Sequence, residues 1–155
     1  MDTHALEEIR ALKYRYLRSL DLKQWDEFAG TLTEDATGDY GSPSGGGPLR
    51  FTGSAEIVGY MRSALNGNII TVHVCSHPDI EVDGETATGS WCLEDTVIVP
   101  DFDVMIRGAA YYRDRYRKDD GRWRIAHTGY ERLYEATMPL SGVTLTANRW
   151  APAAP

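Results

Sequence analysis

From residue 69 to residue 134 the apolar residues recur with a period of two, over a large part of the 155-residue chain. This period is typical of strands that bury one face. It predicts strands near 69–77, 79–83, 86–98, 104–118 and 122–134. Asp83-Gly84 and the Asp119–Gly121 turn are hairpin signals between them. We therefore expect these strands to form a long antiparallel meander.

Helical patterns come before the strands. Residues 4–20 place apolar side chains at three- and four-residue steps, which predicts an amphipathic helix with one buried face. Shorter helices are predicted over 23–32 and 55–65, the latter capped by Ser54, with a strand near 37–40 between them. Helices followed by an antiparallel meander indicate an α+β fold, in which a curved sheet around the helices would enclose a cavity.

The length predicts one domain, which we place over residues 1–138. Residues 139–155 are rich in Pro, Ala and Thr and are expected to form an extended arm or a lid. The stretch 41–48, G-S-P-S-G-G-G-P, is interpreted as a flexible loop between strands. It lacks the lysine and the following helix of a phosphate-binding loop.

Charge and composition restrict the partners. The net charge of −7 argues against nucleic acid and against an anionic membrane surface. No apolar stretch approaches transmembrane length, and the N-terminus lacks the apolar segment of a signal peptide. Cys75 and Cys92 fit a reducing compartment better than a disulfide framework. A cytoplasmic protein without membrane or nucleic-acid partners is therefore expected.

Two histidines lie within the strand pattern of residues 69–83. In a strand, His73, Cys75 and His77 would share one face, and the valines between them the other. The two imidazoles would then lie about 13 Å apart, too far to share a metal ion. His73 is either a core histidine bonded to the backbone or an acid–base group in a pocket. His77 precedes a proline and is expected to be exposed or structural.

Two carboxylates have positions that suit a buried role. Asp21 follows the predicted first helix, where it is either an inward residue or a cap for the next helix. Asp95 falls on the apolar face of its strand and would need a cationic partner there. Arg107 and Arg132 interrupt strand patterns and are candidates for that partner. A one-residue bulge would turn Glu94 inward instead of Asp95.

Tyr16 lies on the apolar stripe of the first helix, where its phenol could donate a hydrogen bond to a substrate oxygen or serve only as a core residue. An inward Tyr, Asp and His together suit proton abstraction beside a carbonyl, or β-elimination. The histidine would be the base, the aspartate would orient it and the tyrosine would be the electrophile. No cofactor motif accompanies this set, so no cofactor and no metal are expected.

Motifs along nearly the whole chain match those of one family. They lie at Ile9–Asp26, Asp35-Ala36, His73–Ile80, Val82–Gly84, Trp91, Tyr112–Tyr116, Asp120–Ile125 and from Met138 onward. On these motifs the chain resembles the SnoaL-like branch of the nuclear transport factor 2-like superfamily, and within it the scytalone dehydratase-like enzymes. Its M-P-L-S-G-V segment is similar to that of hexachlorocyclohexane dehydrochlorinase.

The resemblance implies a cone-shaped, strongly curved antiparallel (mixed) sheet with three N-terminal helices enclosing an apolar pocket, also called NTF2-like or cystatin-like. By motif position, the His–Asp base of this family falls on His73 and Asp21. The helix tyrosine of the bile acid dehydratase falls on Tyr16, and its further acid and arginine on Asp95 and Arg132. The resemblance also implies a homo-oligomer, a trimer in preference to a dimer, with the C-terminal arm closing the pocket.

These expectations combine into one leading hypothesis. The chain is expected to be a cofactor-independent lyase that removes water by β-elimination from a small, hydrophobic, ring-containing substrate. One alternative is an isomerase or polyketide cyclase with the same base. Another is a non-catalytic ligand-binding domain, in which His73 and Asp21 would not be within hydrogen-bonding distance.

Overall fold

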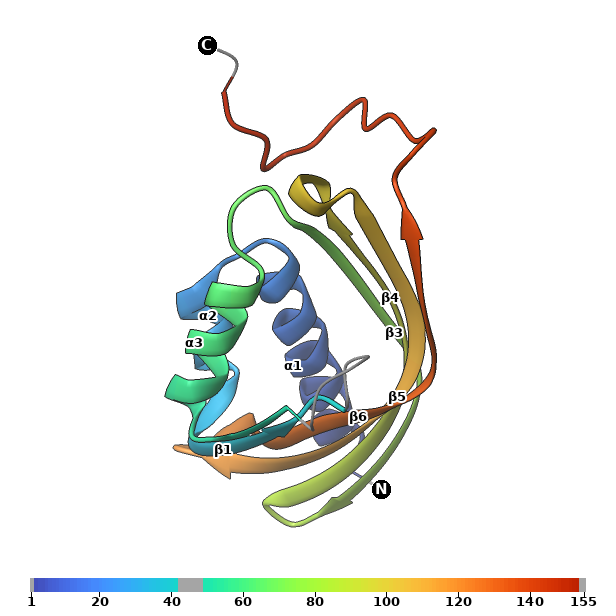
Figure 1. Cartoon of the computed structure of the whole chain (residues 1–155). Helices are drawn as coiled ribbons and strands as arrows, with labels where there is room; N and C mark the ends of the chain where they lie inside the picture. The colour runs from blue at the N-terminus through green and yellow to red at the C-terminus, as the bar shows by residue number, and fades with distance from the viewer. Residues whose placement is uncertain (1, 42–48, 154–155) are drawn as a thin grey trace.

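A computed structural model of the chain describes residues 2–41 and 49–153 (Figure 1). Within these ranges the elements are α1 (Thr3–Asp21), α2 (Trp25–Gly30), β1 (Leu32–Asp39), β2 (Arg50–Thr52), α3 (Ser54–Ala64), β3 (Ile70–Asp83), β4 (Thr86–Val99), the 3-10 helix η1 (Pro100–Phe102), β5 (Val104–Asp119) and β6 (Arg122–Pro139). The predicted α+β class is confirmed. The helices do not all precede the strands, because β1 and β2 lie between α2 and α3.

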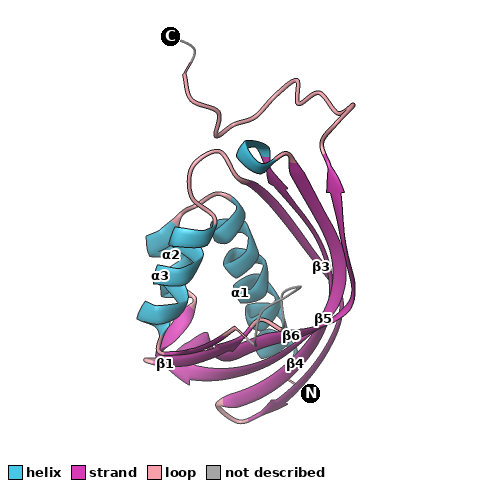
Figure 2. Ribbon diagram, in the orientation of Figure 1, coloured by secondary structure: helices cyan, strands magenta, loops and turns pink. Residues whose placement is uncertain are grey.

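The described strands form one mixed sheet in the order β2-β1-β6-β5-β4-β3 (Figure 2). Strands β3 to β6 are the predicted antiparallel meander, and β1 joins it by pairing parallel to β6. Helices α1 to α3 lie on the same side of this sheet (Figures 1 and 2). The meander therefore ends in β3, at one edge of the described sheet, where α1 packs beside it.

Several predicted boundaries are wrong for local reasons. The strands predicted over 69–77 and 79–83 are the single strand β3, whose pairing with β4 shifts register between Ser76 and Asp79. His77 lies at this bulge with a φ of 50°, so it leaves the regular alternation. Strand β6 continues to Pro139, beyond its predicted end, because it pairs with β5 up to Val104.

The predicted cap of α3 is also wrong. Its N-cap is Gly53, with a φ of 93°, and no side chain makes a capping bond there. Ser54 is instead the first residue of the helix. The loop predicted over 41–48 lies outside the described residues except for Gly41.

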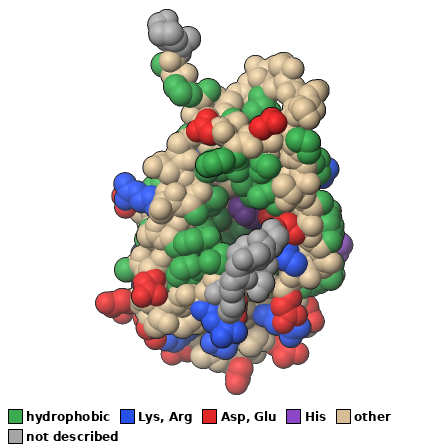
Figure 3. Space-filling view, viewed as in Figure 1, with side chains coloured by type: hydrophobic (Ala, Val, Ile, Leu, Met, Phe, Trp, Pro, Cys, Tyr) green, Lys and Arg blue, Asp and Glu red, His purple; other side chains and the backbone are tan. Residues whose placement is uncertain are grey.

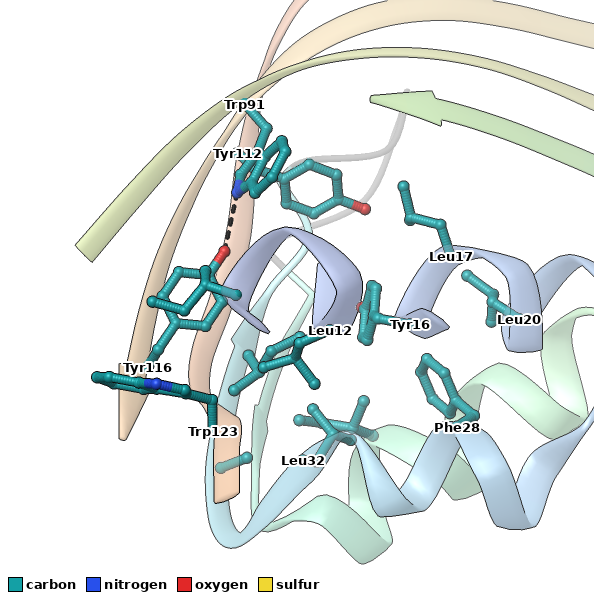
Figure 4. Packing of buried hydrophobic residues seen from close by; sticks show 14 of the residues in the cluster. Leu12, Tyr16, Leu17, Leu20, Phe28, Leu32, Trp91, Tyr112, Tyr116 and Trp123 are labelled. Atoms are coloured by element: carbon teal, nitrogen blue, oxygen red, sulfur yellow. Dashed lines mark hydrogen bonds between the residues drawn. The ribbon is translucent and has the colours of Figure 1, made fainter. Parts of the chain in front are cut away.

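The core fills the space between α1 and the sheet (Figure 4). The predicted apolar stripe of α1 is buried, with Tyr16 fully enclosed and packed against Phe28 at 4.9 Å between ring centroids. Large aromatic side chains of the sheet face it, and Trp91 donates a hydrogen bond from Nε1 to Tyr116 Oη at 2.8 Å. Each fully buried side chain of this size contributes roughly 1.5–3 kcal/mol. This packing holds α1 in place against β3 and β6.

A charged pair lies within this core. Lys13 Nζ is 2.7 Å from Asp114 Oδ2, and both side chains are fully buried. The ammonium also lies 3.3 Å from the centroid of the Tyr112 ring, and Tyr116 donates from Oη to Asp114 Oδ2 at 2.7 Å. Burial lowers the pKa of Lys13 even though Asp114 acts in the opposite direction. The pair is therefore shielded from water, and removing one of the two charges would leave the other buried without a partner and destabilise the fold.

The chain beyond β6 runs across the end of the molecule that carries η1 and the α3–β3 loop (Figure 1). Leu140 donates its backbone N–H to Asp103 O at 3.0 Å, and Asn148 Nδ2 donates to Asn68 O at 3.2 Å. Lys23 Nζ lies 4.5 Å from the centroid of the Trp150 ring. Among the helices in residues 2–41 and 49–153, none is both long and apolar enough to cross a membrane.

Candidate active site

Asp21 and His73 meet where the end of α1 lies against β3. Asp21 is the last residue of α1, and its Oδ1 lies 2.6 Å from His73 Nδ1. Asp21 Oδ2 accepts the backbone N–H of His73 at 2.9 Å, and Oδ1 also accepts the Thr71 hydroxyl at 2.8 Å. These three bonds hold the carboxylate and the imidazole in one relative orientation.

The pairing of β3 explains this arrangement. In an antiparallel pair, successive residues direct their N–H and C=O groups alternately toward the partner strand and away from it. His73 directs its N–H away from β4, toward the end of α1, where Asp21 accepts it. Because an ionised carboxylate only accepts hydrogen bonds, Nδ1 is the protonated nitrogen, and Nε2 carries the lone pair. The side chains of His73 and Asp21 are 12% and 19% exposed. The pair is therefore mostly shielded from water but remains accessible to a ligand.

Asp95 and Arg132 form a second pair beside the first. Asp95 lies directly opposite His73 in the β3–β4 register. Its Oδ1 and Oδ2 accept from Arg132 Nη1 and Nη2 at 2.5 and 2.9 Å, which is a bidentate ion pair. Asp95 therefore faces inward as predicted, and Arg132 is its partner. The other candidate, Arg107, is exposed.

Gly108 of β5 is the residue that lets Arg132 reach Asp95. In the sheet, Asp95 pairs with Gly108, and the Arg132 guanidinium of β6 lies over this glycine. A Cβ atom at Gly108 would be 2.6 Å from Arg132 Nη1 and 2.9 Å from Tyr134 O. Any other residue here would force the guanidinium or the strand to move, so the glycine belongs to the architecture of the site.

Tyr16 is bonded to a different partner. Its Oη lies 2.8 Å from Tyr40 Oη, and both side chains are buried. Burial raises the pKa of both phenols above the usual value, so both are neutral hydrogen-bonding groups at physiological pH. Among the described residues no hydrogen bond joins Tyr16 to Asp21 or His73. The structure thus brings Asp21 to His73 and Asp95 to Arg132, and places Tyr16 with Tyr40.

An aromatic wall connects these groups. The Tyr130 ring lies 5.8 Å from Tyr40 and 5.4 Å from Tyr112, and the Arg132 guanidinium lies 4.9 Å from the Tyr130 ring centroid. Tyr40 also packs against Phe51 at 6.0 Å. Tyr40 and Tyr112 are buried in the core, and Tyr130 is the half-buried ring of this wall that borders a pocket.

The surface is hollowed at the site. A groove of about 550 Å³ between α1 and β3 is bordered by Asp21, His73 and Cys75. A pocket of about 450 Å³ is bordered by Tyr130 and Arg132 together with Asp39, Arg113 and Glu131. Figure 3 shows a hollow lined by hydrophobic side chains, with a histidine inside it. Asp21, His73 and Arg132 therefore border space that a small molecule could occupy.

The remaining histidines have other partners. His77 is exposed at the bulge of β3 and lies 3.3 Å from the Ser76 hydroxyl, as expected for a structural residue. His127 Nδ1 lies 2.7 Å from Thr37 Oγ1, and His4 lies near Glu8. Cys75 shares the inner face with His73, and burial raises the pKa of its thiol to about 11. Within the described ranges, no three His, Cys, Asp or Glu side chains gather in a cluster that could hold a metal ion.

The prediction from sequence missed several residues of the site. Thr71 and Tyr40 had a usable signal, since Thr71 alternates with His73, and Tyr40 follows the buried Ala36 and Gly38 at steps of two. Glu135, whose Oε2 lies 3.3 Å from Arg132 Nε, had no such signal. Its contact depends on the long extension of β6 and on a register shift that the period of two does not reveal.

Comparisons with known proteins agree with this architecture. A family model described as the SnoaL-like domain matches residues 1–129. Among solved structures, a candidate scytalone dehydratase from Novosphingobium aromaticivorans is similar at 18% identity and a TM-score of 0.75, over 85% of this chain and 86% of that one. A type 2 hexachlorocyclohexane dehydrochlorinase (LinA) is similar at 18% identity and a TM-score of 0.75, over 93% and 94% of the two chains.

A third similar structure is a protein of unknown function from Mycobacterium tuberculosis. It is 24% identical, with a TM-score of 0.68, over 83% of this chain and 71% of that one. At these identities the structural likeness establishes a shared fold. The fold hosts several chemistries, so the reaction has to be argued from the site.

Proposed function

We propose that this chain, which belongs to the SnoaL-like domain family, is a cofactor-independent lyase that removes water from a small ring-containing substrate. The observation that carries the proposal is the bond between Asp21 and His73, which leaves the Nε2 lone pair of a largely buried imidazole for a substrate proton. The names of two similar structures, a dehydratase and a dehydrochlorinase, both denote eliminations and support this choice.

The proposed reaction is a β-elimination. His73 Nε2 takes the proton from the carbon beside a carbonyl, and Asp21 stabilises the imidazolium that forms. The C–H electron pair becomes a C=C bond as the C–O bond to the β-hydroxyl breaks. The imidazolium then returns its proton to the departing oxygen, and water leaves. Atoms and electrons balance without an oxidant or a cofactor.

Tyr16 and Tyr40 are proposed as hydrogen-bond donors to the substrate carbonyl or to the leaving hydroxyl. Both phenols stay protonated because burial raises the pKa of each, so they can stabilise negative charge as it develops on oxygen. Asp95 and Arg132 are proposed to support this arrangement, since Asp95 lies opposite His73 and the Arg132 guanidinium lies over the Tyr130 ring.

The proposed pocket is the apolar space between the helices and a cone-shaped, strongly curved sheet. A closed pocket would exclude bulk water from the base and strengthen the hydrogen bonds made inside it. Residues 139–155 are proposed to form an arm that covers its mouth. The contacts of Asn148 with Asn68 and of Trp150 with Lys23 support this, because both draw the arm across that end of the molecule.

The reaction class is tested with 3-hydroxycyclohexanone in D₂O, followed by mass spectrometry. A lyase gives cyclohexenone, lighter by one water. An isomerase or cyclase with the same base leaves the mass of the parent compound unchanged except for deuterium gained beside the carbonyl. A ligand-binding domain gives neither product nor exchange above the rate in buffer, and that result would contradict the proposal.

We also propose that the chain assembles as a homotrimer through the outer face of the sheet. Four of the exposed large apolar side chains lie on β3, β5 and β6 on the face away from the helices, namely Val72, Val74, Tyr111 and Tyr134. Their burial between copies would remove an apolar patch from water. Light scattering during size-exclusion chromatography is expected to give three times the chain mass. Replacing Val74 with glutamate is expected to lower the measured mass. A wild-type chain that has the mass of a monomer would contradict the proposal.

A further inference from the structure

The guanidinium of Arg132 is held by two carboxylates at once. Asp95 accepts from both Nη atoms, and Glu135 Oε2 lies 3.3 Å from Nε. The side chain of Glu135 is 25% exposed and that of Arg132 18%, and Arg132 borders the pocket of about 450 Å³. An arginine beside an apolar pocket is usually suited to binding a carboxylate or phosphate of a ligand. Here the N–H groups of the Arg132 guanidinium already have carboxylate partners in Asp95 and Glu135.

The charges beside His73 and Arg132 also disfavour an anionic ligand. Asp21, Asp95 and Glu135 are three carboxylates, and Arg132 is the cation that two of them share. With His73 neutral, the group carries a net negative charge. The phenols of Tyr16 and Tyr40 remain uncharged donors. An anionic ligand would therefore meet repulsion in a partly desolvated space, where charges interact more strongly than in water.

We propose that Glu135 is a specificity-determining residue that keeps Arg132 from binding anionic ligands and so restricts the pocket to uncharged rings. The inference rests on the proposed function only in using the same pocket, because it concerns binding and requires no turnover. Glu135 would disfavour anionic ligands, and Asp95 would hold the Arg132 guanidinium in position. Gly108 supports both by leaving room for the guanidinium over β5.

The test uses two ligands of the same shape, 2-naphthol and 2-naphthoate, which differ at neutral pH by one negative charge. Their affinities are measured by isothermal titration with the wild-type chain and with Glu135→Gln, which keeps the side-chain shape and removes its charge. The matched control is Glu94→Gln on strand β4, since Glu94 is exposed and borders neither the groove nor the pocket described above. Thermal melts confirm that each variant is folded.

The wild-type chain is expected to bind 2-naphthol at least about 10-fold more tightly than 2-naphthoate. Glu135→Gln is expected to narrow this ratio by about 10-fold, the effect of one unit charge several ångströms away at an effective dielectric constant of about 20. Glu94→Gln is expected to leave the ratio unchanged.

Several results would overturn the proposal. They are a wild-type chain that binds 2-naphthoate as tightly as 2-naphthol, an unchanged ratio in Glu135→Gln, equal effects of the two glutamine variants, and no binding of either ligand. The two proposals can fail separately. An absence of turnover with the expected ratios would remove the lyase proposal alone, and turnover with unchanged ratios would remove the role of Glu135 alone.

Discussion

Replacing His73 with alanine is expected to lower turnover of the ring ketone about 10²- to 10⁴-fold, the usual effect of losing a general base. The fold should survive, because the His73 side chain is partly exposed and its backbone N–H still meets Asp21. Asp21→Asn is expected to act in the same direction. The amide can no longer stabilise the imidazolium, and its NH₂ group competes for the position of the His73 proton.

The rate of cyclohexenone formation, followed by ultraviolet absorbance, measures both effects. His77→Ala is the matched control, since His77 lies on the same strand, is exposed and, within the described residues, makes a side-chain hydrogen bond only with Ser76. It should keep wild-type turnover. Full activity in His73→Ala, with circular dichroism unchanged, would show that the imidazole is not the base.

Replacing Lys13 with methionine is expected to destabilise the chain by about 3–5 kcal/mol, because it leaves the Asp114 carboxylate buried without its cation. The methionine occupies a similar volume, so little of this loss comes from packing. The Tyr112 ring also loses the ammonium that lies 3.3 Å from its centroid. The loss in free energy of unfolding is measured by urea denaturation.

The double variant Lys13→Met, Asp114→Asn separates the charge from the packing. It removes both charges, while the asparagine oxygen can still accept the Tyr116 hydroxyl that Asp114 accepts at 2.7 Å. Its stability is expected to recover by more than half of the loss seen in the single variant. A double variant as unstable as Lys13→Met would show that burial of an uncompensated carboxylate is not the cause.

Much of the fold was accessible from the period of the apolar residues. The stripe of α1 and the alternation of β4 identified inward residues correctly, including Asp95, because one face of each element packs against a common core. The bulge at His77 was not accessible, since a shift of register leaves the composition of the strand unchanged. The strand predicted near 37–40, between the second and third helices, is the end of β1, but β1 begins at Leu32, the last residue assigned to the predicted second helix.

Part of the candidate site could also be predicted from the sequence, but for a different reason. Asp21 and His73 were paired through a family resemblance, and their positions in the chain show no direct sign of contact. Lys13 has the right spacing for the buried stripe, four residues after Ile9, but a lysine there is ordinarily assigned to solvent. Its partner Asp114 lies a hundred residues later, and periodicity carries no information about pairs so far apart.

The bonds of Asp21 have a consequence for aggregation. A strand at the edge of a sheet offers unpaired N–H groups to which another chain can add a strand, and β3 is a long strand in that position, with Val72 and Val74 exposed. By accepting the backbone N–H of His73, Asp21 occupies one of these groups and fixes a helix end and a negative charge beside it. The carboxylate proposed to orient the base therefore also protects the sheet edge against unwanted strand addition.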